Sequence, residues 1–287
     1  MLINISRIRN LLFPQFEERL TNVEYHQIPL TAEFLKNISQ IIQMTQPVYT
    51  KAPLIRIGRN GDGGYVISPE FESNICLTLG VGSEVSADLD LISKGFKLFA
   101  FDGTVLNPLP GNIAYRFEQK NIGYGEGDES ITNLERIYNK FPELEQADLI
   151  MIDIEGHEYR VFEEEIVFIS KAKQVVVEFH GLELMGDPNF AKRIILILEE
   201  LLKSHAPIHV HGNNCGGTLA IGGASWPTIL EITFLAKNYC IPESNYGPFP
   251  TTLDFPNSKI RPDIDLTGFY GKIKTFSTLA KSILNIQ

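Results

Sequence analysis

The sequence predicts an α/β fold built on a doubly wound, mostly parallel β-sheet, and three observations support this prediction. Apolar runs of strand length recur along the chain at 75–79, 97–101, 147–153 and 174–179. Amphipathic helical patterns separate several of these runs, as the crossover connections of a parallel sheet require. The run at 149–152 is apolar without alternation, which is typical of a strand that is buried on both faces.

The composition limits the class of protein and the partners that it binds. The chain has 287 residues, of which 44% are hydrophobic, enough for a well-packed core. A formal net charge of −10 argues against nucleic acid, which proteins bind through clustered Lys and Arg. Three scattered cysteines favour a reducing, cytoplasmic setting, and no stretch approaches the roughly 18 apolar residues of a membrane span.

We expect an N-terminal helical extension at 1–52, a main domain at 53–240, and a C-terminal extension at 241–287 that packs on the main domain. A helix is predicted from Thr31, as its N-cap, to about Gln46. Its apolar stripe comprises Phe34, Leu35, Ile38, Ile41 and Ile42. Such a stripe favours packing against the main domain, with a homodimer contact or a lid as the alternatives.

A hairpin is predicted at 54–67, around the turn Gly61-Asp62-Gly63-Gly64-Tyr65. The glycines leave backbone amides open, and the carboxylate of Asp62 lies among them. We therefore expect the amides and Asp62 to face a ligand, just ahead of the strand at 75–79.

The next stretch of sequence indicates a strand, a glycine turn, a helix and a second strand. The residues that end the two strands are Gly80, Val81 and Gly82 after the first, and Asp102 and Gly103 after the second. Glycines let the backbone approach a ligand closely, and an acid about 20 residues further on holds the hydroxyls of a nucleotide ribose. We therefore expect a cofactor that contains a nucleoside.

The helix between these two strands has a predicted N-cap at Ser83 and a predicted stop at Lys94-Gly95. Its predicted inner face comprises Val85, Leu89 and Ile92. A dinucleotide fingerprint needs a third glycine where Val85 stands, so NAD is disfavoured and a cofactor without phosphate, such as S-adenosylmethionine, is favoured. A Gly-x-Gly turn alone is also typical of an ordinary βαβ unit, and the spacing to Asp102 decides between the two interpretations.

Further strands are predicted at 113–119, 147–153, 174–179, 208–211 and 229–235. No crossover helix separates the last two, so we expect them to be antiparallel. The sheet therefore consists of parallel strands that end in an antiparallel pair.

Two further helices have N-terminal signals. A capping box of Thr132 and Glu135 predicts one helix, and Asp187 as N-cap with Pro188 in the first turn predicts the other. His205 is predicted to lie in the last turn of this second helix.

Polar side chains gather where the predicted strands end, which is where open α/β sheets bind their ligands. Besides the glycine turn and Asp102, they are Asp153, Glu155, His157, Glu178, His180, His211, Asn213 and Asn214. Each has an ordinary structural explanation when taken alone, and we interpret Glu158 as a solvated helix residue and His209 as a core histidine. Their common position at one edge of the sheet favours a shared site.

Asp153-Ile154-Glu155-Gly156-His157-Glu158 resembles the Asp-[Ile/Val]-Glu-Gly-x-Glu motif of FkbM-type S-adenosylmethionine-dependent methyltransferases. The segments 61–65, 178–180 and 209–214 resemble motifs of their methyltransferase-like relatives, and the similarity covers roughly residues 54–240. It implies a Rossmann-like class I methyltransferase fold with strand order 3-2-1-4-5-7-6 and an antiparallel strand seven. It also implies S-adenosyl-L-methionine as the cofactor.

The resemblance assigns the glycine turn to the cofactor and Asp102 to its ribose. The chain departs from the family pattern at Thr78, where an acid is usual, and at Glu84, where a third glycine is usual. We therefore expect Asp62 to hold the methionine end of the cofactor. The expected cofactor-binding residues are Asp62, Gly80, Val81, Gly82, Asp102, Gly103 and Asp153.

Methyl transfer to a hydroxyl needs alignment of the reactants and a base, and the expected catalytic residues are His180, His157, Asp153 and Glu178. His180 and His157 are preferred over His211 as the base. A continuing strand keeps Glu178 and His180 on one side, and a helix that opens at 155–156 brings Asp153 and His157 together at i and i+4. Asp153 and Glu178 can instead hold a divalent metal such as Mg²⁺, but we favour a metal-free site because the histidines suffice.

The resemblance implies O-methylation of a small molecule or glycan, and the acidic composition fits a neutral sugar hydroxyl of a surface glycan. The expected substrate-binding residues are His211, Asn213 and Asn214. Two other classes remain open: a nicotinamide-dependent oxidoreductase, which Val85 disfavours, and a non-catalytic adaptor that keeps the fold, which the polar side chains at one edge disfavour.

Overall fold

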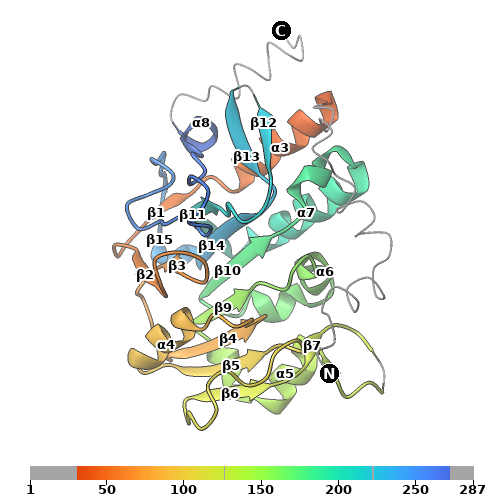
Figure 1. Cartoon of the computed structure of the whole chain (residues 1–287), viewed down its shortest axis with the longest axis vertical. Coiled ribbons are helices and arrows are strands. Elements are labelled where there is room, and N and C mark those ends of the chain that lie inside the picture. The colour runs from red at the N-terminus through yellow and green to blue at the C-terminus, as the bar shows by residue number, and fades with distance from the viewer. Residues whose placement is uncertain (1–30, 126, 222, 272–287) are drawn as a thin grey trace. The chain divides into compact units, whose positions relative to one another are not determined.

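The structure, a computed structural model, describes residues 31–125, 127–221 and 223–271 (Figure 1). The chain divides into two units, Met1–Leu30 and Thr31–Gln287, and every described residue belongs to the second. Within the described ranges, no helix is long and apolar enough to cross a membrane.

A seven-stranded sheet forms the centre of this second unit, with the strand order β11-β14-β10-β9-β4-β5-β6 (Figure 1). Its strands are β4 (Ile75–Leu79), β5 (Lys97–Phe101), β6 (Tyr115–Glu118), β9 (Leu149–Ile152), β10 (Gln174–Phe179), β11 (His205–Gly212) and β14 (Leu230–Ala236). β14 runs antiparallel to both β10 and β11, and the other neighbours pair in parallel. Counted along the chain, this is the order 3-2-1-4-5-7-6 with an antiparallel seventh strand, so the predicted topology is confirmed.

The strand register brings the candidate residues to one edge. β4 lies between β5 and β9, and Leu79 pairs with Phe101 on one side and with Ile152 on the other. The next residues along the three strands are Gly80, Asp102 and Asp153. These residues therefore leave the sheet side by side, although two of them are more than 50 positions apart in the sequence.

Helices and short 3₁₀ segments surround the sheet. They are α3 (Ala32–Met44), α4 (Ser86–Ser93), α5 (Leu134–Lys140), α6 (Glu158–Ile169), α7 (Pro188–Leu201), α8 (Thr267–Tyr270), η1 (Pro142–Gln146), η2 (Leu182–Gly186) and η3 (Lys237–Tyr239). Leu77, Phe99 and Ile150 face a large core that includes residues of α3, α5, α6 and α7. Residues Cys76 and Leu98 face a smaller core with α4 and the β2–β3 hairpin (β2, Ile55–Ile57; β3, Tyr65–Ile67). Both faces of the sheet are thus covered, as the unalternating apolar runs predict.

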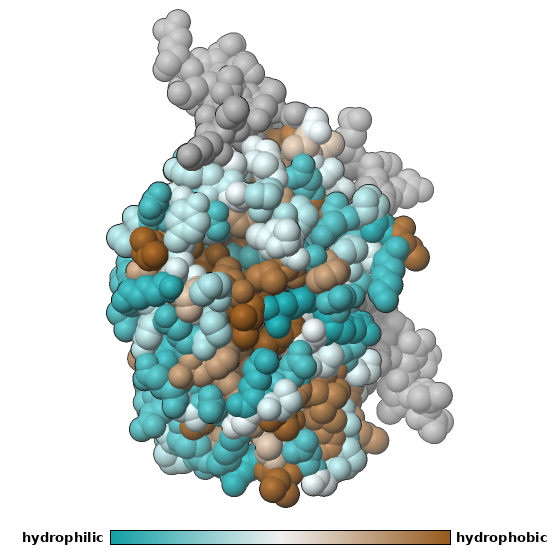
Figure 2. Space-filling model, turned by 90° about the vertical axis from the view of Figure 1, so that its left-hand side faces the viewer, coloured by the Kyte–Doolittle hydropathy of each residue, from teal (hydrophilic) through white to brown (hydrophobic). Residues whose placement is uncertain are grey.

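Four two-stranded ribbons complete the described chain. They are β1 (Val48–Thr50) with β15 (Cys240–Ser244), β2 with β3, β7 (Asn121–Ile122) with β8 (Ile131–Thr132), and β12 (Thr218–Ile221) with β13 (Ala224–Pro227). The β2–β3 hairpin confirms the one that was predicted at 54–67. Figure 2 shows the side of the molecule on which the β1–β15 ribbon lies, and hydrophobic residues gather near the middle of that face among hydrophilic ones. Tyr49 and Ile241 of the ribbon are exposed.

The predicted helix after Thr31 is α3, and the Thr31 side chain accepts a hydrogen bond from the Phe34 N–H at 3.0 Å. The apolar stripe of α3 is buried in the large core, and Asn37 donates to the Met185 carbonyl at 2.8 Å. α3 and β1, which were assigned to an N-terminal extension, belong to the same compact unit as the sheet. A homodimer through this helix stays a prediction, and it would have to use the exposed residues of α3.

Three local predictions are wrong. α4 has Val85 as its N-cap without a side-chain bond, and its buried residues include Ala87 and Leu91, whereas Leu89 is 46% exposed. Of the predicted inner face, Val85 and Ile92 pack against the smaller core, and only Leu89 is misplaced. α5 is capped by Asn133, whose side chain accepts from the Arg136 N–H, while Thr132 belongs to β8. His205 opens β11 rather than ending a helix.

Candidate functional site

The turn after β4 requires a glycine at position 80. Gly80 has a φ of +81°, and a Cβ at this position would lie 1.7 Å from the Asp153 carbonyl oxygen. The ends of β4 and β9 therefore approach more closely than any side chain permits. Gly82 also has a positive φ, of +60°, but no heavy atom lies within 4 Å of where its Cβ would stand. This second glycine faces open space.

Asp102 closes the glycine turn. Its Oδ2 accepts hydrogen bonds from the N–H groups of Val81 at 2.9 Å and Gly82 at 2.8 Å. Its Oδ1 accepts from the N–H and the hydroxyl of Thr104, both at 2.6 Å. Burial alone would raise the pKa of Asp102, but these hydrogen bonds outweigh it and lower the pKa. Asp102 is therefore a fixed carboxylate beside the turn, and the structure brings together the residues that were predicted to form this half of the site.

Gly103 also has a packing reason to be glycine. A Cβ at this position would lie 2.2 Å from the Asn121 side-chain oxygen. The segment after β5 therefore packs directly against β7.

The hairpin loop at 58–64 lies against the start of α4. A Cβ on Gly63 would lie 2.3 Å from Cγ of Glu84, and Arg59 forms an ion pair with Glu84 at 2.6 Å. Asp62 accepts a hydrogen bond from the Asn257 amide at 3.4 Å, and its charge is one of those that raise the pKa of Glu178. Asp62 thus lies near the end of β10, and its contact with a ligand stays a prediction.

The ends of β9 and β10 carry an acid cluster, which we define as Asp153, Glu155, Glu158, Glu178 and His180. Nε2 of His180 lies 3.9 Å from Oδ1 of Asp153, 3.8 Å from Oε2 of Glu155 and 3.9 Å from Oε2 of Glu178. These distances are longer than hydrogen bonds. Asp153, Glu178 and His180 therefore meet as the sequence predicted, but the ring nitrogen bonds none of the three carboxylates.

Glu158 is the hydrogen-bond partner of His180, which was not predicted from the sequence. The Glu158 side chain is fully buried, and its Oε1 lies 3.1 Å from Nδ1 of His180. The same oxygen accepts from the N–H groups of Ile154 at 3.2 Å and Gly156 at 3.0 Å. Glu158 was interpreted as a solvated helix residue, and this is wrong. Its place as the last acid of the motif at 153–158 was the sequence signal, but its burial depends on contacts that folding makes with distant residues.

The chain bends sharply before α6. Glu155 has a φ of +54° and Gly156 a φ of +95°, and α6 begins only at Glu158. A helix does not open at 155–156, so the predicted i, i+4 relation between Asp153 and His157 is wrong. His157 is the N-cap residue of α6, and burial lowers its pKa.

Charge accumulates in the acid cluster. Burial raises the pKa of Asp153 to about 7, against the attraction of His180, and burial also raises the pKa of Glu178. Burial alone would lower the pKa of His180, but the bond to Glu158 and the nearby Asp153 raise it to about 9. Within the described ranges, no Lys or Arg forms an ion pair with the cluster. The negative charge of the cluster is therefore not neutralised by Lys or Arg, and a bound cation or added protons would stabilise it.

The predicted substrate residues divide into two groups. Asn213 donates to Oε2 of Glu178 at 3.2 Å, so it lies beside the acid cluster. The Asn214 amide donates to three backbone carbonyls, those of Ser258, Arg261 and Pro262, and its oxygen accepts from the Ser258 N–H. Asn214 is buried and its side chain is fully used within the chain. This geometry gives it a structural role rather than the predicted contact with substrate.

His211 is likewise held by the chain. Its Nδ1 lies 3.1 Å from Oε2 of Glu231, and its Nε2 lies 3.0 Å from Oδ1 of Asp263. Burial would lower its pKa, but these carboxylates raise it to about 10. Both ring nitrogens are occupied, so His211 is not placed to bind substrate as predicted.

His211 belongs to a larger attachment of the segment 249–266, which we call the C-terminal strap. His209 contacts Asp254 of the strap at 3.1 Å, and Asn257 donates to Glu231 at 2.7 Å. Burial would raise the pKa of Asp254, but His209 lowers it to about 2. The strap therefore crosses the ends of β11 and β14 and reaches Asp62, beside the acid cluster.

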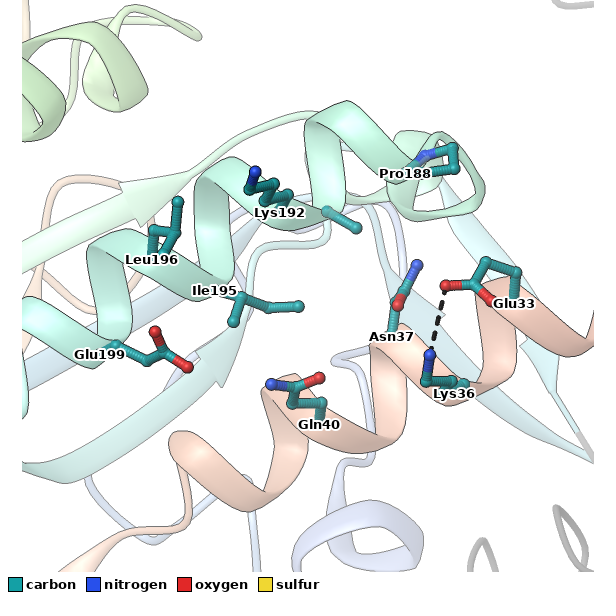
Figure 3. A pocket seen from close by; sticks show the side chains of 10 residues that line it. Glu33, Lys36, Asn37, Gln40, Pro188, Lys192, Ile195, Leu196 and Glu199 are labelled. Atoms are coloured by element: carbon teal, nitrogen blue, oxygen red, sulfur yellow. Dashed lines mark ion pairs between the residues drawn. The ribbon is translucent and has the colours of Figure 1, made fainter.

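A groove between α3 and α7 lies apart from these residues (Figure 3). Side chains of α3 and α7 face each other across it, and Lys36 pairs with Glu33 at 3.6 Å along its rim. No residue of the glycine turn, the acid cluster or the strap lines this groove. We assign the site to the strand edge, where the charges and the buried polar groups lie.

A family model described as the methyltransferase FkbM domain matches residues 45–204, more than half of the chain. No curated protein matches the chain.

Two solved structures are among those that match the chain. One is Sp1610 of Streptococcus pneumoniae, described as a suggested tRNA (m1A22) methyltransferase, in complex with S-adenosyl-L-methionine: identity is 10%, the TM-score is 0.33, and the match covers 74% of this chain and 75% of that one. The other is the bifunctional kinase-methyltransferase WbdD, with 14% identity and a TM-score of 0.33. That match covers 73% of this chain and 38% of WbdD.

Proposed function

The chain belongs to the FkbM methyltransferase family, and on this basis we propose that it transfers a methyl group from S-adenosyl-L-methionine to a sugar hydroxyl, in a surface glycan or a related small molecule. The observation that carries the proposal is the position of the acid cluster directly beside the glycine turn. Asp153 follows β9 at the point where its carbonyl touches Gly80. A donor at the turn and an acceptor at the cluster would be neighbours.

The residues at the ends of β4 and β5 fit a nucleoside cofactor. S-adenosylmethionine supplies a methyl group on a positively charged sulfur. Gly82 faces open space, and Asp102 is an ionised acceptor beside it. Four hydrogen bonds already fill the Asp102 carboxylate, so a ribose hydroxyl would have to replace one of them. The Thr104 hydroxyl is the member of the four that a side-chain rotation can remove, whereas the other three are backbone N–H groups.

The side chains around the cluster favour an acceptor rich in hydrogen-bond donors. Carboxyl oxygens accept hydrogen bonds, and Asp62, Asp153 and Glu178 all contribute to the electrostatics of this one space. Sugar hydroxyls donate and carry no charge, so they suit such a lining, whereas phosphate groups would be repelled. Asn213, beside Glu178, adds an amide for the same purpose and stays a proposed substrate contact.

A hydroxyl that attacks the methyl group must lose its proton, and the acid cluster would receive it. The sequence favoured a histidine, His180 or His157, as the base. With a pKa of about 9, the His180 ring holds a proton at neutral pH, so we assign proton acceptance to the cluster as a whole. Glu178, Asp153 and His180 remain the proposed catalytic residues.

Cofactor binding can be tested directly by titrating the purified protein with S-adenosylhomocysteine in a calorimeter. We expect micromolar-range binding that Asp102→Ala weakens at least about tenfold. Asp102→Asn tests the same carboxylate with its shape preserved, and Glu129→Gln, an exposed acid outside the site, is the control. Circular dichroism checks that each variant folds. Binding of NAD in place of S-adenosylhomocysteine would reject the proposal.

The acceptor class can be tested by incubating the protein with the labelled methyl donor and panels of nucleotide sugars and surface-glycan oligosaccharides. Mass spectrometry should find one added methyl group on a sugar hydroxyl. Methylation of protein or RNA only would reject the glycan assignment while leaving the methyltransferase assignment intact.

A further inference from the structure

We propose that Asp153, Glu155 and His180 form a binding site for one divalent first-row metal ion. One ligand atom from each residue lies within 4.8 Å of the other two. Two are carboxylate oxygens and the third is Nε2 of His180. Three protein ligands leave positions open for a substrate, which is the usual plan of a catalytic rather than a structural metal site.

The distances indicate a gap of the right size. Nε2 of His180 lies 3.8–3.9 Å from the oxygens of Asp153, Glu155 and Glu178, too far for hydrogen bonds. Ligands about 2.1 Å from a common ion lie about 3.0–3.4 Å from one another. Nε2 of His180 and the oxygens of Asp153 and Glu155 therefore need to approach by roughly 0.4–0.9 Å around a cation. The two carboxylate oxygens lie within 4.8 Å of each other, and rotation of the exposed Glu155 side chain allows them to approach as well.

A buried and unpartnered oxygen points to a missing ligand. Oδ1 of Asp153 is cut off from solvent and has no hydrogen-bond partner in the part of the chain that the structure describes. It is the atom that lies 3.9 Å from Nε2 of His180. A buried carboxylate oxygen without a partner costs free energy, and a cation between it and the imidazole would satisfy both groups.

The second ring nitrogen of His180, Nδ1, is hydrogen-bonded as in known metal sites. Histidine ligands usually donate their second N–H to a carboxylate or carbonyl, which fixes the ring and the tautomer. Nδ1 of His180 lies 3.1 Å from Oε1 of the fully buried Glu158, and the Tyr159 hydroxyl donates to the His180 carbonyl. Glu158 is itself held by two backbone N–H groups. Glu158 is thus a positioning residue that directs Nε2 toward the carboxylates.

The ligand set selects the type of ion. Carboxylates suit Mg²⁺ and Mn²⁺, whereas imidazole suits Zn²⁺, Fe²⁺ and other transition metals. Mn²⁺ is common to both preferences, so it is the ion that we expect to bind. This replaces the metal-free interpretation that the sequence favoured, and Glu155 and His180 replace Glu178 in the predicted ligand set.

The role of the ion rests on the proposed function, whereas its binding does not. A divalent ion with open positions can hold two neighbouring hydroxyls of a sugar and weaken the O–H bond of the one that is methylated. The released proton would pass to Glu178, the carboxylate beside the three ligands that does not belong to them.

The test is a titration of the full chain with MnCl₂ alone, followed by calorimetry and by the electron paramagnetic resonance signal of free Mn²⁺. We expect one ion per chain, with an affinity that Glu155→Gln and Asp153→Asn each weaken at least about tenfold. Glu155 is exposed, so its variant should fold normally, and Glu129→Gln is the control that keeps wild-type affinity.

Two results would overturn the proposal: no Mn²⁺ binding by the wild type, or equal affinity in Glu155→Gln and Glu129→Gln. Titration with S-adenosylhomocysteine in the same buffer separates this outcome from failure of the proposed function. Cofactor binding without Mn²⁺ binding rejects only the metal site, and Mn²⁺ binding without cofactor binding rejects only the methyltransferase proposal.

Discussion

His180 and His211 lie in similar chemical surroundings and have opposite hydrogen-bonding states. Each is an imidazole at the carboxyl edge of the sheet with carboxylates on both sides, and His211 is buried whereas His180 is partly buried. One carboxylate beside each histidine comes from a pair of neighbouring strand residues: Glu178 of β10 lies near His180, and its partner Glu231 of β14 contacts His211. His211 bonds a carboxylate with each ring nitrogen, whereas His180 bonds only Glu158 and directs Nε2 into a gap.

This difference separates a structural imidazole from a functional one. His211 joins the strap to β14, so its hydrogen bonds contribute to stability and leave nothing for a ligand. His180 has one nitrogen fixed by Glu158 and one that bonds no carboxylate, which is the arrangement that a metal ligand requires. The type of residue and the nearby acids do not distinguish the two, and the number of satisfied ring nitrogens does.

The largest expected effect is on stability, from His211→Ala. Removing the imidazole leaves Glu231 and Asp263 facing each other without a counter-charge, and breaking a buried ion pair in this way costs about 3–5 kcal/mol. Denaturant unfolding of the variant and the wild type measures the loss. Asp263→Asn should cost less, because it leaves the buried Glu231 paired. An unchanged free energy of unfolding in His211→Ala would show that His211 is not a structural imidazole.

His180→Ala should have its main effect on turnover. Loss of the ring removes either a proton acceptor or a metal ligand, so kcat should fall at least about 10²-fold while S-adenosylhomocysteine affinity is kept. Glu158 keeps its two backbone donors in this variant, so the loss of stability should be smaller than in His211→Ala. Normal turnover on the acceptor found by the glycan screen would show that His180 is not the functional imidazole.

Glu158→Gln sharpens the comparison, because it alters the support of His180 and leaves the ring in place. A partner behind a histidine ligand typically contributes 10–100-fold to metal affinity or activity, and we expect a loss at the lower end of this range in the Mn²⁺ titration. The two backbone N–H groups can still bond the Gln oxygen. If Mn²⁺ affinity is unchanged in Glu158→Gln but lost in His180→Ala, Glu158 does not position the ring.

The strap should give stability a gradual dependence on pH. The pKa of His211 is raised to about 10 by Glu231 and Asp263, from an ordinary value of about 6.5. The folded chain therefore holds one proton more than the unfolded chain between these two values. Its stability should fall by about 1.4 kcal/mol per pH unit as the pH rises through this window, and the contribution is complete below it.

Unfolding of the wild type and of His211→Ala at several values between pH 7 and pH 10 measures this slope. Other groups titrate in the same range, so the quantity to compare is the difference between the two proteins. Parallel pH profiles would mean that His211 does not hold the extra proton.

The sequence determined the fold and the first half of the site. Strand and helix periods give the order of elements, and the absence of a crossover helix after β11 gives the antiparallel strand, because these patterns are local. The turn at 80–82 and Asp102 were also predictable from spacing, since two adjacent parallel strands end at the same edge. The helix caps at Ser83 and Thr132 were wrong, because several polar residues compete for each cap and tertiary packing selects one.

Only the tertiary structure decided which polar groups are satisfied. Asp263 lies 52 residues from His211 and Met185 lies 148 residues from Asn37, and no local pattern predicts such pairs. The same holds for Glu158, whose burial depends on contacts with distant residues, and for Asn214, whose amide is taken by the strap. Whether a polar side chain is structural or reactive depends on its remaining hydrogen-bonding capacity, and that is set by partners that folding brings together from distant parts of the chain.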